Sequence, residues 1–224
     1  MIMLILSAFS FTQPPDGIFK KAYDQKLINI DASGSSKQDI NGSFDYTKPE
    51  YSIEPWDKRY DWCSNCGRSY DEHPWITYSV KSKKVKFSGY YVRAGCCYAG
   101  CCCMDDYAYC VHCCLYSWSL QISNDNKTWE TVHKISKDDN MRDCKDNTYI
   151  FDKSYTTKYV RLIQDEACPG EPPCLSINRI ELFGDIVGDS SDSAAEEEFV
   201  SFHDDDDDVS IIGHISRQDR IRVV

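Results

Sequence analysis

Apolar and polar residues alternate with a period of two through the middle of the chain. Residues 116–123 alternate without a break, residues 85–91 alternate over most of their length, and residues 75–80 are rich in β-branched and aromatic side chains. Such segments form strands that offer one apolar face to a core and one polar face to water. The pattern predicts an all-β fold in which two sheets pack face to face.

Further strands are predicted where short apolar runs lie between clusters of Gly, Pro, Asn, Asp or Lys. They cover residues 27–30, 131–135, 148–151, 159–164 and 177–183. Eight short strands separated by turns predict an eight-stranded antiparallel jelly-roll β-sandwich. A chain of 224 residues has room for one such domain but not for a second full one.

Two long irregular segments interrupt the predicted strands, at residues 32–71 and 95–114. Loops of this length in a compact domain are usually functional, so we expect the binding surface to lie on them. We assign residues 27–184 to the sandwich and residues 1–26 to a lead-in, which is either a short signal peptide or an N-terminal strand. Residues 185–224 form an acidic tail that we expect to be disordered.

Five segments occur in the order and spacing of a known family. They are 75–78, 90–93, 117–125 with Trp129, 159–162 and 179–184. In this order they resemble the coagulation factor V/VIII type C (discoidin) family, a member of the galactose-binding-like group. The resemblance implies an eight-stranded jelly roll that binds sugars, lipid head groups or proteins through loops at one end. Most of the matching residues have structural roles first, and Trp118, Ile122, Trp129 and Leu162 are spaced as core anchors.

The chain departs from this family at three places. Members often close the domain with a disulfide after the last Gly, but Asp185 follows Gly184 here. Sugar-binding relatives often carry a calcium-ligating Glu where this chain has Arg179, which makes a calcium site doubtful. Membrane-binding members have apolar and basic loop tips, whereas the first long loop here is acidic, polar and aromatic.

Thirteen cysteines are many for a chain of this size, and most lie between Cys96 and Cys114. Cys63 and Cys66, and likewise Cys110 and Cys113, have the Cys-x-x-Cys spacing that lets two thiolates reach one tetrahedral zinc ion. A structural zinc site, loop disulfides and free thiols all remain open. In the disulfide case, a Cys168–Cys174 bond would close the Pro-rich loop between these residues.

Aromatic and charged side chains alternate in the first long loop. An aromatic ring stacks on the C–H groups of a sugar while a charged neighbour binds its hydroxyls, so this composition suits a carbohydrate site. The alternative is that the rings pack the loop onto the sandwich. The candidate ligand-binding residues are Tyr46, Trp56, Arg59, Tyr60 and Trp62.

The formal charge of −11 lies mostly in the tail, where residues 185–224 carry 12 acidic and 3 basic side chains. Without a basic surplus, nucleic acid is excluded as a partner and anionic membrane is disfavoured. In the tail, Val209, Ser210, Ile211 and Ile212 follow five aspartates and resemble a motif that binds SUMO-like proteins by strand addition. The sequence does not distinguish a secreted protein from a cytoplasmic one.

Two functions remain for the whole chain. The first is a non-enzymatic recognition module, with a glycan as ligand by analogy with the family. The second is an intracellular protein–protein interaction scaffold with a zinc-clamped loop and an acidic tail that recruits partners. Hydrolase chemistry has little support, because the sequence contains no nucleophile elbow, zincin motif or phosphate-binding glycine loop.

Overall fold

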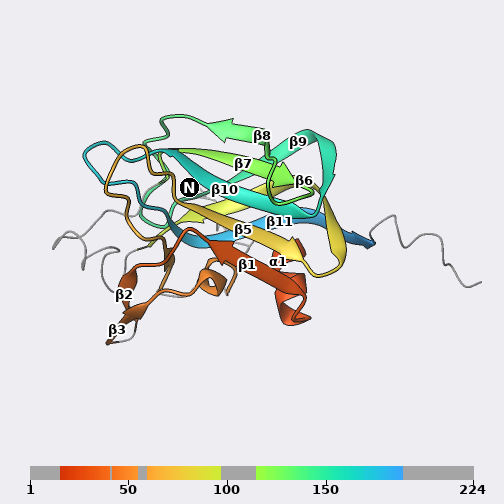
Figure 1. Ribbon diagram of the computed structural model, residues 1–224, viewed down its shortest axis with the longest axis horizontal. Helices are drawn as coiled ribbons and strands as arrows, with labels where there is room; N and C mark the ends of the chain where they lie inside the picture. Colours follow the sequence, from red (N-terminus) through yellow and green to blue (C-terminus); the bar gives the residue numbers. More distant parts are fainter. Residues whose placement is uncertain (1–15, 41, 55–59, 97–114, 189–224) are drawn as a thin grey trace, which may run out of the picture. The chain divides into compact units, whose positions relative to one another are not determined.

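The computed structural model describes residues 16–40, 42–54, 60–96 and 115–188 (Figure 1). Two sheets make up the sandwich: a five-stranded sheet in the order β1-β5-β10-β7-β8 and a four-stranded sheet in the order β4-β11-β6-β9. Strands β2 and β3 form a separate ribbon. The elements, in chain order, are α1 (Ile18–Asp24), β1 (Ile28–Ala32), β2 (Lys37–Ile40), β3 (Ser43–Tyr46), η1 (Pro49–Ser52), β4 (Trp62–Cys63), β5 (Trp75–Val80), β6 (Lys83–Ala94), β7 (Ser117–Ser123), β8 (Glu130–Ile135), β9 (Asp146–Thr157), β10 (Tyr159–Glu166) and β11 (Ser176–Gly188).

The eight predicted strands correspond to β1 and β5–β11, so the all-β sandwich is confirmed. In β10 the alternation of the sequence becomes an alternation of burial, with Val160, Leu162 and Gln164 buried and their neighbours half-buried. Leu162 lies opposite Ile76 of β5 and Leu120 of β7 in the antiparallel register. A period of two therefore sets which residues face the second sheet.

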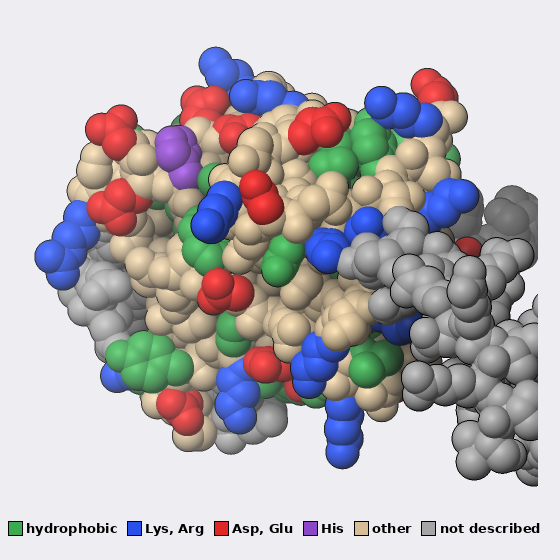
Figure 2. All heavy atoms as spheres, turned by 45° about the vertical axis from the view of Figure 1, so that its right-hand side comes forward, with side chains coloured by type: hydrophobic (Ala, Val, Ile, Leu, Met, Phe, Trp, Pro, Cys, Tyr) green, Lys and Arg blue, Asp and Glu red, His purple; other side chains and the backbone are tan. Residues whose placement is uncertain are grey.

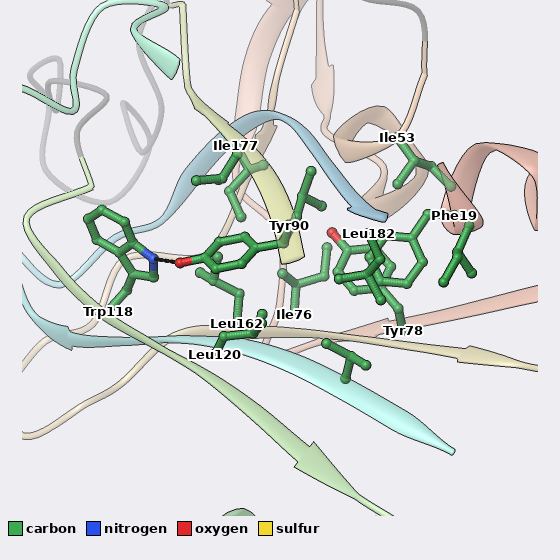
Figure 3. Packing of buried hydrophobic residues seen from close by; sticks show 14 of the residues in the cluster. Phe19, Ile53, Ile76, Tyr78, Tyr90, Trp118, Leu120, Leu162, Ile177 and Leu182 are labelled. Atoms are coloured by element: carbon green, nitrogen blue, oxygen red, sulfur yellow. Dashed lines mark hydrogen bonds between the residues drawn. The ribbon is translucent and has the colours of Figure 1, made fainter. Parts of the chain in front are cut away.

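The core fills the space between the two sheets, and Figure 3 shows side chains from both of them meeting there. Trp118 of β7 is fully buried, and its indole Nε1 donates a hydrogen bond to Tyr90 Oη of β6 at 3.1 Å. Tyr90 Oη lies 2.9 Å from His133 Nδ1 of β8. The Tyr90 oxygen has two lone pairs and one proton, so while it accepts from Trp118 it can either donate to His133 Nδ1 or accept from it, according to the tautomer of the imidazole ring.

The partial burial of His133 predicts a loss of stability in mild acid. Burial lowers the pKa of His133 below its usual value near 6.5, so the unfolded chain takes up the proton more readily than the folded one. The free energy of unfolding should therefore fall as the pH drops from about 7.5 to 5.5. Urea unfolding at these two pH values measures the loss. His133→Gln, which cannot take up a proton, should reduce the loss, whereas Ile150→Ala, which changes an exposed side chain without a titratable group, should leave it unchanged. Equal pH dependence in all three proteins would contradict the prediction.

Trp129 does not enter the core, contrary to the expectation from its family motif. The guanidinium carbon of Arg161 lies 4.0 Å from the centre of the half-exposed Trp129 ring. Arg161 Nε and Nη2 both donate to Gln121 Oε1, at 2.9 and 2.6 Å. Arg161 of β10 and Trp129, the residue before β8, thus stack on each other on the outer face of the five-stranded sheet.

Helix α1 lies in the segment that the sequence analysis assigned to a lead-in, and it packs on the sandwich. Ile18, Phe19 and Ala22 are buried, and the Phe19 ring stacks on Tyr78 of β5 at 4.3 Å between ring centres. The first turn of the helix has no side-chain cap of its own. Its Phe19 and Lys20 backbone N–H groups donate instead to the buried carboxylate of Glu181 on β11, at 2.7 and 3.0 Å. None of the helices in the described ranges combines the length and the apolar character needed to cross a bilayer.

Candidate ligand-binding end of the sandwich

The antiparallel topology places the long connections of the sandwich at one end. Arg93 near the end of β6 lies opposite Asp146 at the start of β9, and Glu166 at the end of β10 lies opposite Ser117 at the start of β7. The connections 33–74, 95–116, 136–145 and 167–175 therefore begin and end at this end, which we call the loop end. The opposite end has short turns at residues 81–82, 124–129 and 158.

Several interactions fix the connections of the loop end to one another. A disulfide joins Cys96 to Cys144, which ties the connection after β6 to the connection after β8. Ser64 N donates to Leu175 O at 2.8 Å, and Gly67 N donates to Pro173 O at 2.7 Å. The backbone of the loop end is thus held by bonds between segments that are far apart in the sequence.

A buried polar network holds the segment around Tyr60 against the sandwich. The carboxylate of Asp61, with no exposed surface, accepts from Asn178 Nδ2 and from the Cys96 backbone N–H, both at 2.8 Å. The Asp61 backbone N–H donates to the buried Gln38 side chain at 3.0 Å. Asp61 therefore joins the first long loop, β11 and the Cys-rich connection. This structural role explains an acidic residue between the predicted site residues Tyr60 and Trp62.

The structure gives the predicted ligand-binding residues different surroundings. Tyr46 is 58% exposed on β3, whereas Trp62 is 0% exposed, and its indole donates to Ser35 Oγ inside the fold. Trp62 is thus a core residue, and its ring face cannot stack on a ligand in this conformation. Tyr60 is half-buried and donates its hydroxyl proton to Glu54 at 2.7 Å. Trp56 and Arg59 lie outside the described residues.

The β2–β3 ribbon carries an aromatic surface that the sequence analysis found only in part. Phe44 is 44% exposed, and it lies on the same face of β3 as Tyr46, two residues away. Lys37 of β2 places its Nζ 5.8 Å from the centre of the Phe44 ring and 5.2 Å from that of Tyr46. The period-two sequence of residues 43–46 could have identified Phe44, but this segment was read as irregular.

The base of the ribbon is anchored to the sandwich through β4. Ser36 N donates to Cys63 O and Thr47 N donates to Ser36 O, both at 3.0 Å. The buried Thr47 hydroxyl also donates to Cys63 O at 3.0 Å. Residues on either side of the ribbon are thus fixed, and Figure 1 shows the ribbon beside the loop end.

The described cysteines are largely in disulfide bonds. Cys63, Cys66 and Cys168 are disulfide-bonded, as are Cys96 and Cys144. In this state Cys63 and Cys66 offer no thiolate to a metal, and Cys110 and Cys113 lie outside the described residues. Zinc binding by these four cysteines remains a prediction, and it would require the disulfide bonds of Cys63 and Cys66 to be reduced.

The Cys168–Cys174 disulfide considered above is not formed. The buried thiol of Cys174 instead donates to Ser64 O at 3.8 Å, and the Cys174 carbonyl accepts from Gln164 Nε2 at 2.9 Å. The Pro-rich loop is therefore positioned by hydrogen bonds at this residue.

The structure also shows the surroundings of Arg179, the residue for which the sequence analysis doubted a calcium site. Arg179 is 3% exposed, with Nη2 3.5 Å from Asp16, while the carboxylate of Glu181 caps helix α1. Burial raises the pKa of Glu181, although three backbone N–H groups and Arg179 favour its charged form. Within the described residues no three His, Cys, Asp or Glu side chains gather as a metal site.

One face of the molecule mixes charges of both signs. Figure 2 shows acidic and basic side chains interspersed there, with hydrophobic side chains in separate places between them. The described residues of that face form no continuous cationic patch, the feature that binding to a phosphate backbone would need.

Comparisons with known proteins bear on the fold. No family model matches the chain, and no curated protein matches it. Among solved structures, CpGH89CBM32-5 from Clostridium perfringens, in complex with GalNAc-beta-1,3-galactose, matches with a TM-score of 0.50 and 14% identity, over 71% of this chain and 97% of that chain. A family 32 carbohydrate-binding module from Clostridium perfringens in complex with galactose matches with a TM-score of 0.47 and 11% identity, over 75% of this chain and 97% of that one.

A chitosan-binding module from a chitosanase/glucanase of Paenibacillus also matches, with a TM-score of 0.47 and 17% identity, over 70% of this chain and 93% of that module. The match to CpGH89CBM32-5 shows a shared fold. The resemblance to the factor V/VIII type C family itself stays a prediction. The chain thus has the antiparallel β-sandwich fold of CpGH89CBM32-5.

Proposed function

We propose that the chain is a non-enzymatic glycan-recognition module that binds its ligand at the loop end, on the face of the β2–β3 ribbon. The observation that carries this proposal is the pair of exposed rings, Phe44 and Tyr46, beside the ammonium group of Lys37. Large aromatic side chains are usually buried, so two on one exposed face favour a binding role.

The chemistry of this face suits a sugar. The flat faces of Phe44 and Tyr46 can pack on the C–H groups of a pyranose ring. Lys37 Nζ, within 6 Å of both ring centres, supplies hydrogen-bond donors for hydroxyl groups at the edge of the same sugar. Trp56 and Arg59, which follow in the same long loop, remain predicted members of this site. The fold it shares with CpGH89CBM32-5 makes galactose-containing disaccharides the first probes to use.

Replacing either ring should weaken glycan binding without unfolding the protein. We expect Tyr46→Ala and Phe44→Ala each to lower the affinity for the best glycan by about tenfold, which corresponds to about 1.4 kcal/mol. Glycan-array binding identifies the ligand, and titration calorimetry with that glycan measures the loss.

The matched control is Ile150→Ala, which removes another exposed large side chain from β9, away from the ribbon. Thermal unfolding should show the same midpoint for the ring variants and for wild type. Undiminished glycan binding by the Tyr46→Ala, Phe44→Ala double variant would exclude the ribbon as the site. An array without any signal would count against glycan recognition as a whole.

The state of the cysteines supports this proposal over the zinc-clamped scaffold. The five disulfide-bonded cysteines named above fit an oxidising compartment, where glycans of cell surfaces and secretions are found. Metal analysis of protein purified with and without reductant separates the two functions, because stoichiometric zinc under both conditions would favour the scaffold.

A further inference from the structure

A second concave surface lies away from the β2–β3 ribbon, where α1, β1 and η1 meet. This pocket has a volume of about 530 Å³, within the range of ligand-binding pockets. Ile28 and Ile30 of β1 contribute apolar side chains to it, and the Tyr23 ring contributes an aromatic one. The remaining lining residues are charged: Asp24, Lys26, Glu50 and Lys81.

Strand β1 forms one edge of the five-stranded sheet, and no strand of the described residues pairs with its outer edge. Lys81 N donates to Leu27 O and Ser33 N donates to Trp75 O, so the odd-numbered residues of this stretch bond to β5. The backbone groups of Ile28 and Ile30 therefore point away from β5. Among the described residues nothing bonds to them, whereas the next outward N–H, that of Ala32, donates to Asp31 Oδ1 at 2.9 Å.

The charged residues that line the pocket are balanced, with Lys26 and Lys81 against Asp24 and Glu50, but the two lysines both lie at the start of β1, whereas Glu50 lies on η1. Asp24 is neutralised by Lys20, whose Nζ lies 2.5 Å from Asp24 Oδ1. Lys81 Nζ donates to the Lys26 carbonyl at 3.2 Å, which places its ammonium group beside the turn between α1 and β1. Neither Lys26 nor Lys81 forms an ion pair with a carboxylate in the part of the chain that the structure describes.

We propose that this edge binds an extended acidic peptide of a partner protein, which adds a strand to the five-stranded sheet beside β1. The backbone of the peptide bonds to the N–H and C=O groups of Ile28 and Ile30. One apolar side chain enters the pocket, and a carboxylate of the peptide lies near Lys26 and Lys81. This site is independent of the proposed glycan site, and either one can exist without the other.

The spacing of the free groups favours a peptide over a sugar. The N–H and C=O groups of Ile28 and of Ile30 recur every two residues, a repeat of about 6.8 Å in an antiparallel sheet. An added strand presents complementary groups at the same repeat, and alternate side chains then point to the pocket side. A monosaccharide in the pocket would satisfy only part of this ladder.

The test uses an acetylated and amidated decapeptide with threonine at every second position and with valine and glutamate in turn at the positions between, so that valine and glutamate share the face toward the pocket. A peptide of the same length with lysine in place of each glutamate is the charge-reversed control. With the full chain, backbone amide hydrogen exchange followed by NMR should slow at least about tenfold at Ile28 and Ile30 in the presence of the glutamate peptide. The lysine peptide should have a much smaller effect. Lys81→Glu should lower the affinity for the glutamate peptide about fivefold.

The matched control is Lys83→Glu, which makes the same charge change in the same turn region on a residue that does not line the pocket. It should bind like wild type. Unchanged exchange at Ile28 and Ile30, or protection confined to the loop end, would overturn the proposal. Slowed exchange that depends on protein concentration without peptide would instead assign the edge to a second copy of the chain. Loss of glycan binding in Lys81→Glu would assign the pocket to a sugar.

Discussion

Glu181→Ala should lower the free energy of unfolding by about 3 to 5 kcal/mol, the usual effect of removing one partner from a buried charged network. The carboxylate has no exposed surface and accepts three backbone N–H bonds, from Phe19, Lys20 and Leu182, at 2.7 to 3.0 Å. Alanine would leave these donors without an acceptor in the interior. It would also remove the negative charge beside Arg179, whose Nε is already buried without a hydrogen-bond partner.

Two controls distinguish this role from a general loss of charge. Glu181→Gln keeps the shape but turns an N–H₂ group toward one of the backbone donors, so we expect a smaller loss of about 2 kcal/mol. Asp24→Asn removes an exposed carboxylate of the same helix and should stay within about 0.5 kcal/mol of wild type. Urea unfolding of all three variants gives the comparison. A loss below 1 kcal/mol for Glu181→Ala would show that α1 does not depend on this cap.

The strands of the sandwich could be predicted because their signal is local. In residues 159–164 and 116–123 the alternation alone shows which side chains face inward, and Leu162 and Leu120 indeed lie opposite each other in the core. The alternation is read from neighbouring residues alone, so it indicates the inward face of any strand that has one face covered.

Helix α1 could not be predicted in the same way, because what stabilises it lies elsewhere in the sequence. It has seven residues, too few for a stable helix alone, and no capping side chain at its start. Its cap, Glu181, is 162 residues away from Phe19 in the chain. The sequence analysis singled out the position of Arg179 for calcium and therefore missed the use of its neighbour as a helix cap.

The candidate site was predicted at the level of composition but not of individual residues. Tyr46 and Trp62 have the same aromatic character in the same long loop, yet one is exposed and the other is fully buried. The difference arises because Trp62 of β4 pairs with Ile177 of β11 inside the sandwich, whereas Tyr46 lies on the separate two-stranded ribbon of β2 and β3. Sequence spacing carries no information on either partner.

The Cys96–Cys144 disulfide should make the second large contribution to stability. It closes a segment of 48 residues, for which the loss of chain entropy in the unfolded state is worth about 4 kcal/mol. The neighbouring backbone bonds, from Ala94 N to Lys145 O and from Cys144 N to Gly95 O, already hold the two segments together in the folded state. We therefore expect the Cys96→Ser, Cys144→Ser double variant to fold with the same sheets and to lose about 2 to 4 kcal/mol.

The single variants provide the control for this prediction. Because either replacement breaks the same bond, Cys96→Ser, Cys144→Ser and the double variant should each lose a similar free energy of unfolding, with strongly non-additive effects. Alkylation under native conditions followed by mass spectrometry should label Cys144 in Cys96→Ser but not in unreduced wild type. If the two single losses add up in the double variant, the cysteines contribute separately and are not joined. The loop end would then depend on backbone hydrogen bonds alone for the contact between these two connections.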